Sequence, residues 1–286
     1  MPNSASFVFQ HLFKNCIIWT RLILAEINRT NLFITASAIA FALFIALIPF
    51  LLIISGLSTL IGGAEFTNFI FKNLTTILPD HVFKTIWPEI EILLKQDASQ
   101  HLIAIGTFGM FIAVTGAIST LRHGFNKCYK RQELRPIWKT RIQSLVLVIL
   151  ALFLLSLISI LGLTIPFIFN LLNNIGFNLV APSYIIHGFD FIIIYAALTI
   201  LLLMLHWYLP CHQPRLTSLL PGICFTLLTN YIVSKLFWFY LSHFDYYTIT
   251  YAGLAGVMAM LVYLEILAIS LLLGALVNKK MNLKLA

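Results

Sequence analysis

The part of this sequence best suited to binding chemistry is a basic stretch from Arg122 to Arg141. It holds seven of the chain's eighteen Lys and Arg residues, although charged residues make up only 10% of the chain. Arginine offers paired donors to phosphate or carboxylate oxygens, and lysine adds a point charge. The residues that could contact an anionic headgroup are Arg122, Asn126, Tyr129, Arg135, Lys139 and Arg141.

Two interpretations of this basic stretch remain open. In the first, Arg122, Asn126 and Tyr129 lie at i, i+4 and i+7 on one face of a helix and help to form a pocket for a phosphate or lipid headgroup. In the second, the cations only orient the chain in a membrane and rest on anionic headgroups, with about 1 kcal/mol gained per basic residue. The first interpretation describes a functional site, and the second describes a topology determinant.

Ionisable residues inside apolar runs form a second group of candidates, because a charge at membrane depth is costly. Glu265 lies midway along such a run. Its carboxylate must face the interior of the helix bundle, pair with a partner or become protonated. Lys235 can extend toward the membrane surface, and Asp190 follows His187 by three residues. With a proline that tends to kink its helix, they define a candidate intramembrane pathway of Pro49, Asp190, Lys235 and Glu265. A structural hydrogen bond and a simple packing kink are the alternatives.

The sequence does not argue for catalysis. Its eight histidines are scattered, and no zinc-protease, nucleotide-binding or serine-hydrolase motif is present. The four cysteines form no C-x-x-C pair, and structural disulfides are not expected. We therefore expect no catalytic residues, no cofactor and no metal site.

The elements that must position these residues are membrane-spanning helices. The chain is 60% apolar with a mean hydropathy of +0.96. Four apolar runs exceed the roughly 18 residues that mark a spanning helix, and two weaker runs are also long enough. The predicted fold class is an all-α polytopic membrane protein, with a single membrane domain over residues 1–286. The six predicted spans cover residues 32–62, 101–121, 145–170, 189–209, 216–241 and 251–277.

The segments outside the spans have different predicted roles. Residues 1–31 are expected to form a cytosolic or interfacial amphipathic helix, and residues 122–144 form the basic cytosolic loop. Residues 63–100 form a periplasmic loop in which the apolar spacing predicts two amphipathic helices. These two helices either pack as a lid on the bundle or guide a substrate.

The distribution of basic residues predicts the orientation of the chain. Fourteen of the eighteen Lys and Arg fall on one side of the predicted topology, three fall on the other, and Lys235 lies within a span. This bias places both termini in the cytosol. It also accounts for the net charge of +8 without a nucleic-acid partner, whose footprint would cluster on a soluble domain.

Small residues recur in two of the predicted spans. The second span carries Gly106, Gly109 and Gly116, and the sixth carries Gly253 and Gly256. Small residues spaced about four apart let helix backbones approach closely, so we expect contacts within the bundle at these positions. A homodimer seam is the alternative, and the sequence does not predict the oligomeric state.

Several short motifs along the chain recur together in one family. They are TASAIAFALFIALIPF from Thr35 to Phe50, AISTLRHGFNKCY from Ala117 to Tyr129, Arg135 with Trp138–Lys139, WYLP from Trp207, LPG from Leu220, YAGLA from Tyr251 and LLGA from Leu272. Together they resemble the YihY/BrkB family of bacterial inner-membrane proteins, some of which were long labelled ribonuclease BN. The resemblance covers nearly the whole chain.

The chain departs from the family pattern in two places. It has Gly274-Ala275-Leu276 where the family usually has Gly-Ala-Glu, and Glu265 lies in a stretch that often lacks an acid. A mechanism that depends on the usual glutamate is therefore not expected to apply unchanged.

The resemblance implies a six-helix inner-membrane protein, and family members have been connected with export of lipid or lipopolysaccharide precursors. The ribonuclease label gains no support from the residues of this chain. The leading hypothesis is a non-enzymatic protein of the bacterial inner (plasma) membrane that handles or translocates an anionic lipid or envelope precursor, with membrane lipids as partners. A structural protein that docks an envelope protein partner is the alternative, and a membrane-bound hydrolase comes third.

Overall fold

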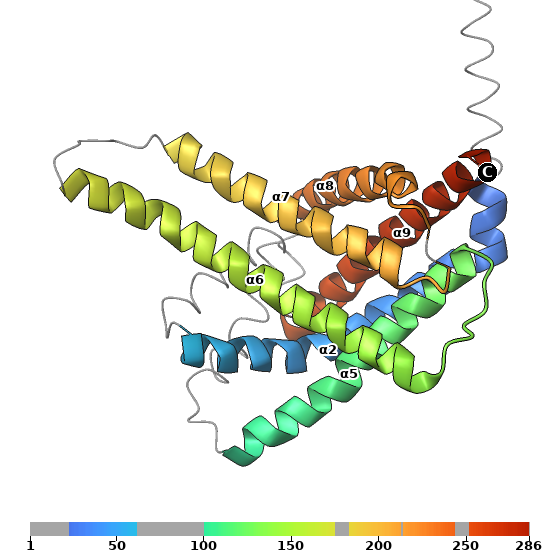
Figure 1. Ribbon diagram of the computed structural model, residues 1–286, viewed down its shortest axis with the longest axis horizontal. Helices are drawn as coiled ribbons and strands as arrows, with labels where there is room; N and C mark the ends of the chain where they lie inside the picture. The colour runs from blue at the N-terminus through green and yellow to red at the C-terminus, as the bar shows by residue number, and fades with distance from the viewer. Residues whose placement is uncertain (1–22, 62–99, 175–182, 213, 244–251, 286) are drawn as a thin grey trace, which may run out of the picture.

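The computed structural model describes residues 23–61, 100–174, 183–212, 214–243 and 252–285 (Figure 1). Within these ranges the chain is helical apart from short connections, and it contains no strand, which confirms the all-α class for this part. The long helices are α2 (Leu32–Ile61), α5 (Gln100–Cys128), α6 (Ile137–Asn174), α7 (Ser183–Tyr208), α8 (Leu220–His243) and α9 (Ala252–Leu285), with a 3-10 turn η1 (Leu216–Ser218) before α8.

A long helix occupies each of the six positions predicted for a span, and the shortest of them has 24 residues. By length and apolar composition, four helices of the described chain are candidate spans. A fifth is added if Ile23–Thr30 and Leu32–Leu47, which are bent by 57°, are counted as one. The predicted number of six is therefore not confirmed. The predictions for residues 1–22 and for residues 63–99 of the outer loop lie outside the described residues.

The connection between α5 and α6 is much shorter than the basic loop predicted over residues 122–144. Helix α5 continues to Cys128 and α6 begins at Ile137, so that only residues 129–136 are non-helical. Pro136 explains the early start of α6, because a proline at a helix start loses no hydrogen bond. Its carbonyl oxygen accepts the backbone N–H of Thr140 at 3.2 Å.

The end of α5 is closed by backbone hydrogen bonds. The N–H of Arg131 donates to the carbonyl of Asn126 at 2.9 Å, and Lys130 between them has a left-handed φ of 56°. This is the arrangement by which helices commonly end, usually with glycine at the left-handed position. It turns the chain sharply and brings the connection back toward the bundle.

The core lies where α2 packs against α5 and α9, while α8 packs against α9 and α6 packs against α7. Ile39, Phe125 and Leu272, from α2, α5 and α9, are almost completely buried there. Figure 1 shows α6 and α7 running beside one another as a long pair. Large apolar side chains such as Phe41 and Ile149 face outward, which suits helices solvated by lipid.

The close helix contacts predicted at Gly109 and Gly116 are not found, because a Cβ atom at either position would meet nothing within 4 Å. The backbones instead approach closely between α8 and α9. A Cβ at Gly222 would overlap the carbonyl oxygen of Gly274, and a Cβ at Gly274 would lie 2.7 Å from that of Gly222. The side chain of Asn278 strengthens this crossing, since its Oδ1 accepts the N–H of Gly222 at 2.7 Å.

Candidate functional site

The predicted headgroup residues lie around the start of α6, and Arg122 is the most deeply buried of the basic ones. Its side chain is 3% exposed, and its terminal nitrogen donates to the carbonyl of Thr140 at 2.8 Å and to the hydroxyl of Ser144 at 2.9 Å. Both bonds come from the same nitrogen, Nη2, at the far end of the long arginine side chain. Arg122 therefore ties α5 to the first two turns of α6.

Asn126, one turn further along α5, joins two connections that are far apart in the sequence. Its amide nitrogen donates to Glu133 Oε2 at 2.9 Å, and its amide oxygen accepts the backbone N–H of Cys211 at 2.7 Å. The side chain is 3% exposed, so neither bond is replaced readily by water. Asn126 thereby connects α5 to both the 129–136 connection and the segment after α7.

Arg135 completes this network. It donates to both carboxylate oxygens of Glu133, at 2.6 and 2.7 Å, and to the carbonyl of Leu209 at 2.8 Å. The hydrogen bonds from Arg135, the largest influence, hold the pKa of the Glu133 carboxyl at about 2, well below its usual range, although burial opposes the shift. The same contact raises the pKa of Arg135. Glu133 is thus a carboxylate at neutral pH and cancels one positive charge of the site.

Acid should weaken this network. Because the pKa of Glu133 is lowered on folding, its carboxylate stabilises the folded state above its ordinary pKa of 4.5, and that contribution is lost as the pH falls toward 2. We expect the difference in thermal midpoint between the natural protein and Glu133→Gln to shrink as the pH falls below about 4.5. Melting curves of the two proteins across this range check the prediction, and a pH-independent difference would contradict it.

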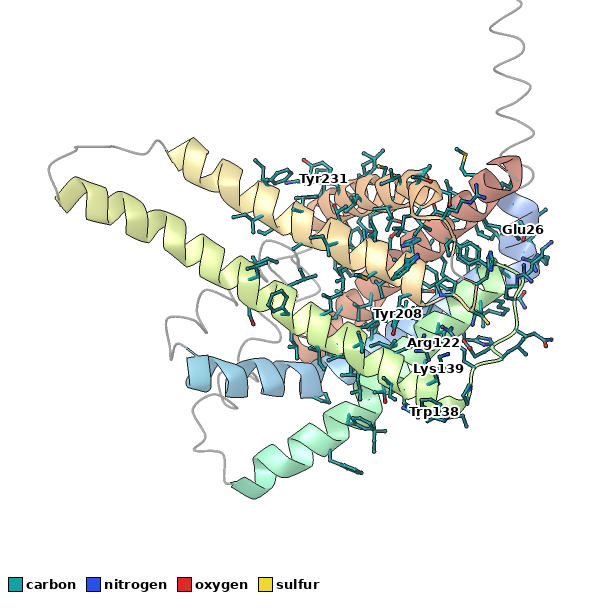
Figure 2. The ribbon with its side chains drawn as sticks, viewed as in Figure 1. Glu26, Arg122, Trp138, Lys139, Tyr208 and Tyr231 are labelled. Carbon is teal, nitrogen blue, oxygen red and sulfur yellow. The ribbon has the colours of Figure 1, made fainter. Side chains whose placement is uncertain are left out.

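The other two basic residues of the candidate site are exposed. Lys139 and Arg141 lie on the first turns of α6, where Arg141 also donates to the hydroxyl of Thr115 on α5. Apolar side chains beside them face outward, with Ile137 78% and Trp138 66% exposed. Figure 2 shows Trp138 and Lys139 at the same end of α6 as Arg122. We name the exposed residues the α6 interfacial patch: Leu134, Ile137, Trp138, Lys139 and Arg141.

Tyr129 differs from its predicted neighbours. It follows the last residue of α5 and packs against the hydrophobic core instead of the α6 interfacial patch. Burial raises the pKa of its phenol. The structure thus joins Asn126 and Arg135 through Glu133 and holds the buried Arg122 separately against the start of α6. It leaves Lys139 and Arg141 at the surface.

The candidate pathway residues do not form one cluster. Glu265 on α9 accepts a hydrogen bond from the Ser37 hydroxyl of α2 at 2.5 Å. Pro49 lies inside α2, about 18 Å further along at a rise of about 1.5 Å per residue. The hydrogen bond from Ser37 satisfies one carboxylate oxygen of Glu265, which lies between apolar helices.

The remaining two pathway residues lie on α8 and α7. Lys235 is exposed on α8, where its ammonium lies 5.8 Å from the centre of the Tyr231 ring one turn earlier. Cation–π attraction and an extended side chain account for this position. Asp190 lies within α7, but its side chain is outside the described part.

The sequence reasoning missed a third charged site, centred on Glu26. Its carboxylate lies 2.5 Å from Arg29, 3.3 Å from Lys130 and 3.1 Å from Lys279. The i, i+3 spacing to Arg29 was visible in the sequence, but the partners beyond α5 and at the end of α9 were not. A polar seam between α8 and α9 was also missed, in which Ser234 meets the Tyr263 hydroxyl at 3.0 Å.

No group of three or more His, Cys, Asp and Glu side chains that could hold a metal ion occurs in the described ranges. A family model described as "Virulence factor BrkB" matches residues 23–285 of this chain. No curated protein and no solved structure matches it.

Proposed function

Since this chain belongs to the virulence factor BrkB family of membrane proteins, we propose that it handles or translocates an anionic lipid or envelope precursor and is not an enzyme. The site proposed for the headgroup is the start of α6. The proposal also places the chain in the bacterial inner membrane with both termini in the cytosol, as the fourteen-to-three split of basic residues favours.

The observation that carries the proposal is the composition of the α6 interfacial patch. Trp138 and Ile137, which are 66% and 78% exposed, lie directly beside exposed cations. Tryptophan next to lysine or arginine suits the boundary between acyl chains and headgroups, where the ring meets the acyl region and the cation meets phosphate. Such a surface favours an amphipathic anion over a soluble one.

The charges at the start of α6 also favour an anion. A helix N-terminus carries a partial positive charge and is stabilised by acidic residues, yet the first turn of α6 contains none. Lys139 and Arg141 add positive charge at the place where the helix dipole disfavours it. Glu133 offsets only part of this charge, because it is already paired with Arg135. A phosphate at this position would relieve the repulsion.

The proposal divides the predicted headgroup residues into two roles. Lys139 and Arg141 contact the headgroup, because their side chains are exposed. Arg122, Asn126 and Arg135 are positioning residues, since their donors hold α6 and the 129–136 connection in place. The buried Arg122 still adds a long-range positive potential to the site.

For the step across the membrane, the proposal assigns Pro49 and Glu265 to the route between α2, α8 and α9. The Ser37–Glu265 hydrogen bond supports this assignment, because it links α2, the helix that contains Pro49, to the acid on α9. Lys235 lies on α8 and Asp190 lies on α7. They have no defined part in the route.

Neutralising the two exposed cations should test the proposed function. With about 1 kcal/mol per basic residue, the variant Lys139→Gln/Arg141→Gln should retain anionic lipid at least roughly tenfold more weakly. The measurement is the ratio of anionic to zwitterionic lipid that remains with the purified protein, obtained by mass spectrometry. Arg131→Gln/Arg215→Gln is the matched control, because it removes two exposed cations outside the α6 interfacial patch. An unchanged ratio in the first variant would contradict the proposal.

A further inference from the structure

Glu26 is placed to hold three separate parts of the chain together. Arg29 belongs to its own short helix, Lys130 follows the end of α5, and Lys279 lies near the end of α9. In Figure 2, Glu26 lies at the end of the molecule where α9 finishes. One carboxylate therefore faces three cations that would repel one another without it.

The contacts around Glu26 lie next to the buried end of α5. Cys128, the last residue of α5, is 1% exposed, and its thiol lies 3.7 Å from the carbonyl of Leu272 on α9. The charges that act on this thiol include Lys279, Arg29 and Glu26. Burial raises the pKa of the Cys128 thiol to about 12, so it is unreactive while the helix ends stay together.

Solvent reaches these ion pairs from one side. The side chains of Lys130 and Arg29 are 52% and 38% exposed, whereas that of Lys279 is 12% exposed. Salt and competing anions therefore reach the outer two cations more easily than the inner one. The inner pair, between Glu26 and Lys279, joins the segment before α2 to the end of α9.

We propose that Glu26 is an ionic latch: its pairing with Lys279 and Lys130 keeps the ends of α5 and α9 closed over the buried Cys128. Loss of the carboxylate leaves three like charges at the junction, and the ends separate. An anion that binds Arg29 and Lys130 in place of Glu26 opens the latch in the same way. This device does not depend on which molecule the α6 interfacial patch binds.

The native thiol reports the state of the latch. In a chain that carries Cys16→Ser, Cys211→Ser and Cys224→Ser, the remaining cysteine is Cys128. A hydrophilic maleimide should label it slowly in the detergent-purified protein at low salt. Glu26→Gln should raise the labelling rate roughly tenfold, a factor that corresponds to about 1.4 kcal/mol.

A double-mutant cycle separates the latch from general loosening. Lys279→Gln alone should also raise the rate. Glu26→Gln/Lys279→Gln should label no faster than the faster single variant, because the Glu26–Lys279 pair is already lost in each single variant. The proposal would be overturned if the increases in labelling rate of the two single variants multiplied in the double variant, or if Glu26→Gln left the labelling rate unchanged.

Two further arms complete the test. Glu133→Gln removes one carboxylate from the other network and should leave the labelling of Cys128 slow; a rate equal to that of Glu26→Gln would overturn a specific latch. Added salt should speed labelling when Glu26 is present, because it screens the ion pairs, and should leave unchanged or slow the labelling of Glu26→Gln, because there it screens the repulsion between the cations. Equal salt responses in the two proteins would also count against it.

Discussion

Replacement of Gly274 by alanine is expected to destabilise the protein by about 3 kcal/mol. The added Cβ would overlap the Thr226 hydroxyl and lie 2.7 Å from the carbonyl oxygen of Gly222. The latter is a backbone atom of α8, so the contact is relieved only if the two helices move apart. The thermal midpoint of the detergent-purified protein, followed by size-exclusion chromatography after heating, measures the effect.

Gly116 provides the matched control, because a Cβ there would meet nothing within 4 Å. Alanine at this helical position should leave the midpoint unchanged or raise it slightly, since alanine favours a helix over glycine by about 1 kcal/mol. Gly222→Ala should behave like Gly274→Ala, as its Cβ would overlap the carbonyl oxygen of Gly274. Equal midpoints for Gly274→Ala and Gly116→Ala would show that α8 and α9 do not cross this closely.

Replacement of Arg122 by lysine is expected to destabilise the protein by about 2 kcal/mol, even though the charge is kept. The guanidinium serves the carbonyl of Thr140 and the hydroxyl of Ser144 together from a side chain that is 3% exposed. The lysine side chain is shorter, so its ammonium leaves at least one of these two buried acceptors without a hydrogen bond. The same thermal assay, with membrane insertion checked by accumulation of the full-length protein, measures the change.

The reverse exchange at a nearby position is the control for Arg122→Lys. Lys139 is exposed at the start of α6, so Lys139→Arg should insert and melt like the natural protein. If the basic residues acted only through the orientation of the chain, both exchanges would be harmless, because lysine and arginine count alike for topology. If Arg122→Lys had the same thermal midpoint as the natural protein, only the role of Arg122 in orienting the chain would remain.

The helices were predictable because apolar runs long enough to cross a bilayer are a strong local signal. The starts of α2 and α9 and the end of α7 lie within one residue of the predicted span limits. The start of α6 differs by eight residues, because Ile137–Ser144 form helix although polar and basic residues interrupt the apolar pattern there. The length of an apolar run therefore predicts that a helix is present but not where that helix begins.

The candidate site was predicted in composition but not in arrangement. The i, i+4 spacing of Arg122 and Asn126 placed both on one helix face, and both are buried. Their partners Ser144, Glu133 and Cys211 come from other segments, and no local spacing encodes such pairings. The same reason explains why Glu26 was overlooked, since two of its three partners lie more than a hundred residues away.

The glycines show the limit of local patterns in a different way. Small residues spaced along α5 suggested close packing, yet Gly109 and Gly116 face open space. The closest backbone approach occurs at Gly222 and Gly274, which lie in the LPG and LLGA motifs. Which small residue meets a neighbour depends on how each helix is rotated, and rotation is set by packing across the whole bundle.

Photo-crosslinking with lipid analogues tests most directly whether an anionic headgroup binds at the start of α6. The protein would be reconstituted with a diazirine-bearing phosphatidylglycerol or, in parallel, with the matching phosphatidylcholine, and the labelled peptides identified by mass spectrometry. We predict preferential labelling of residues 134–142 by the anionic lipid, and loss of that preference in Lys139→Gln/Arg141→Gln. Equal labelling of this segment by both lipids, or a preference unaffected by the two substitutions, would contradict the account.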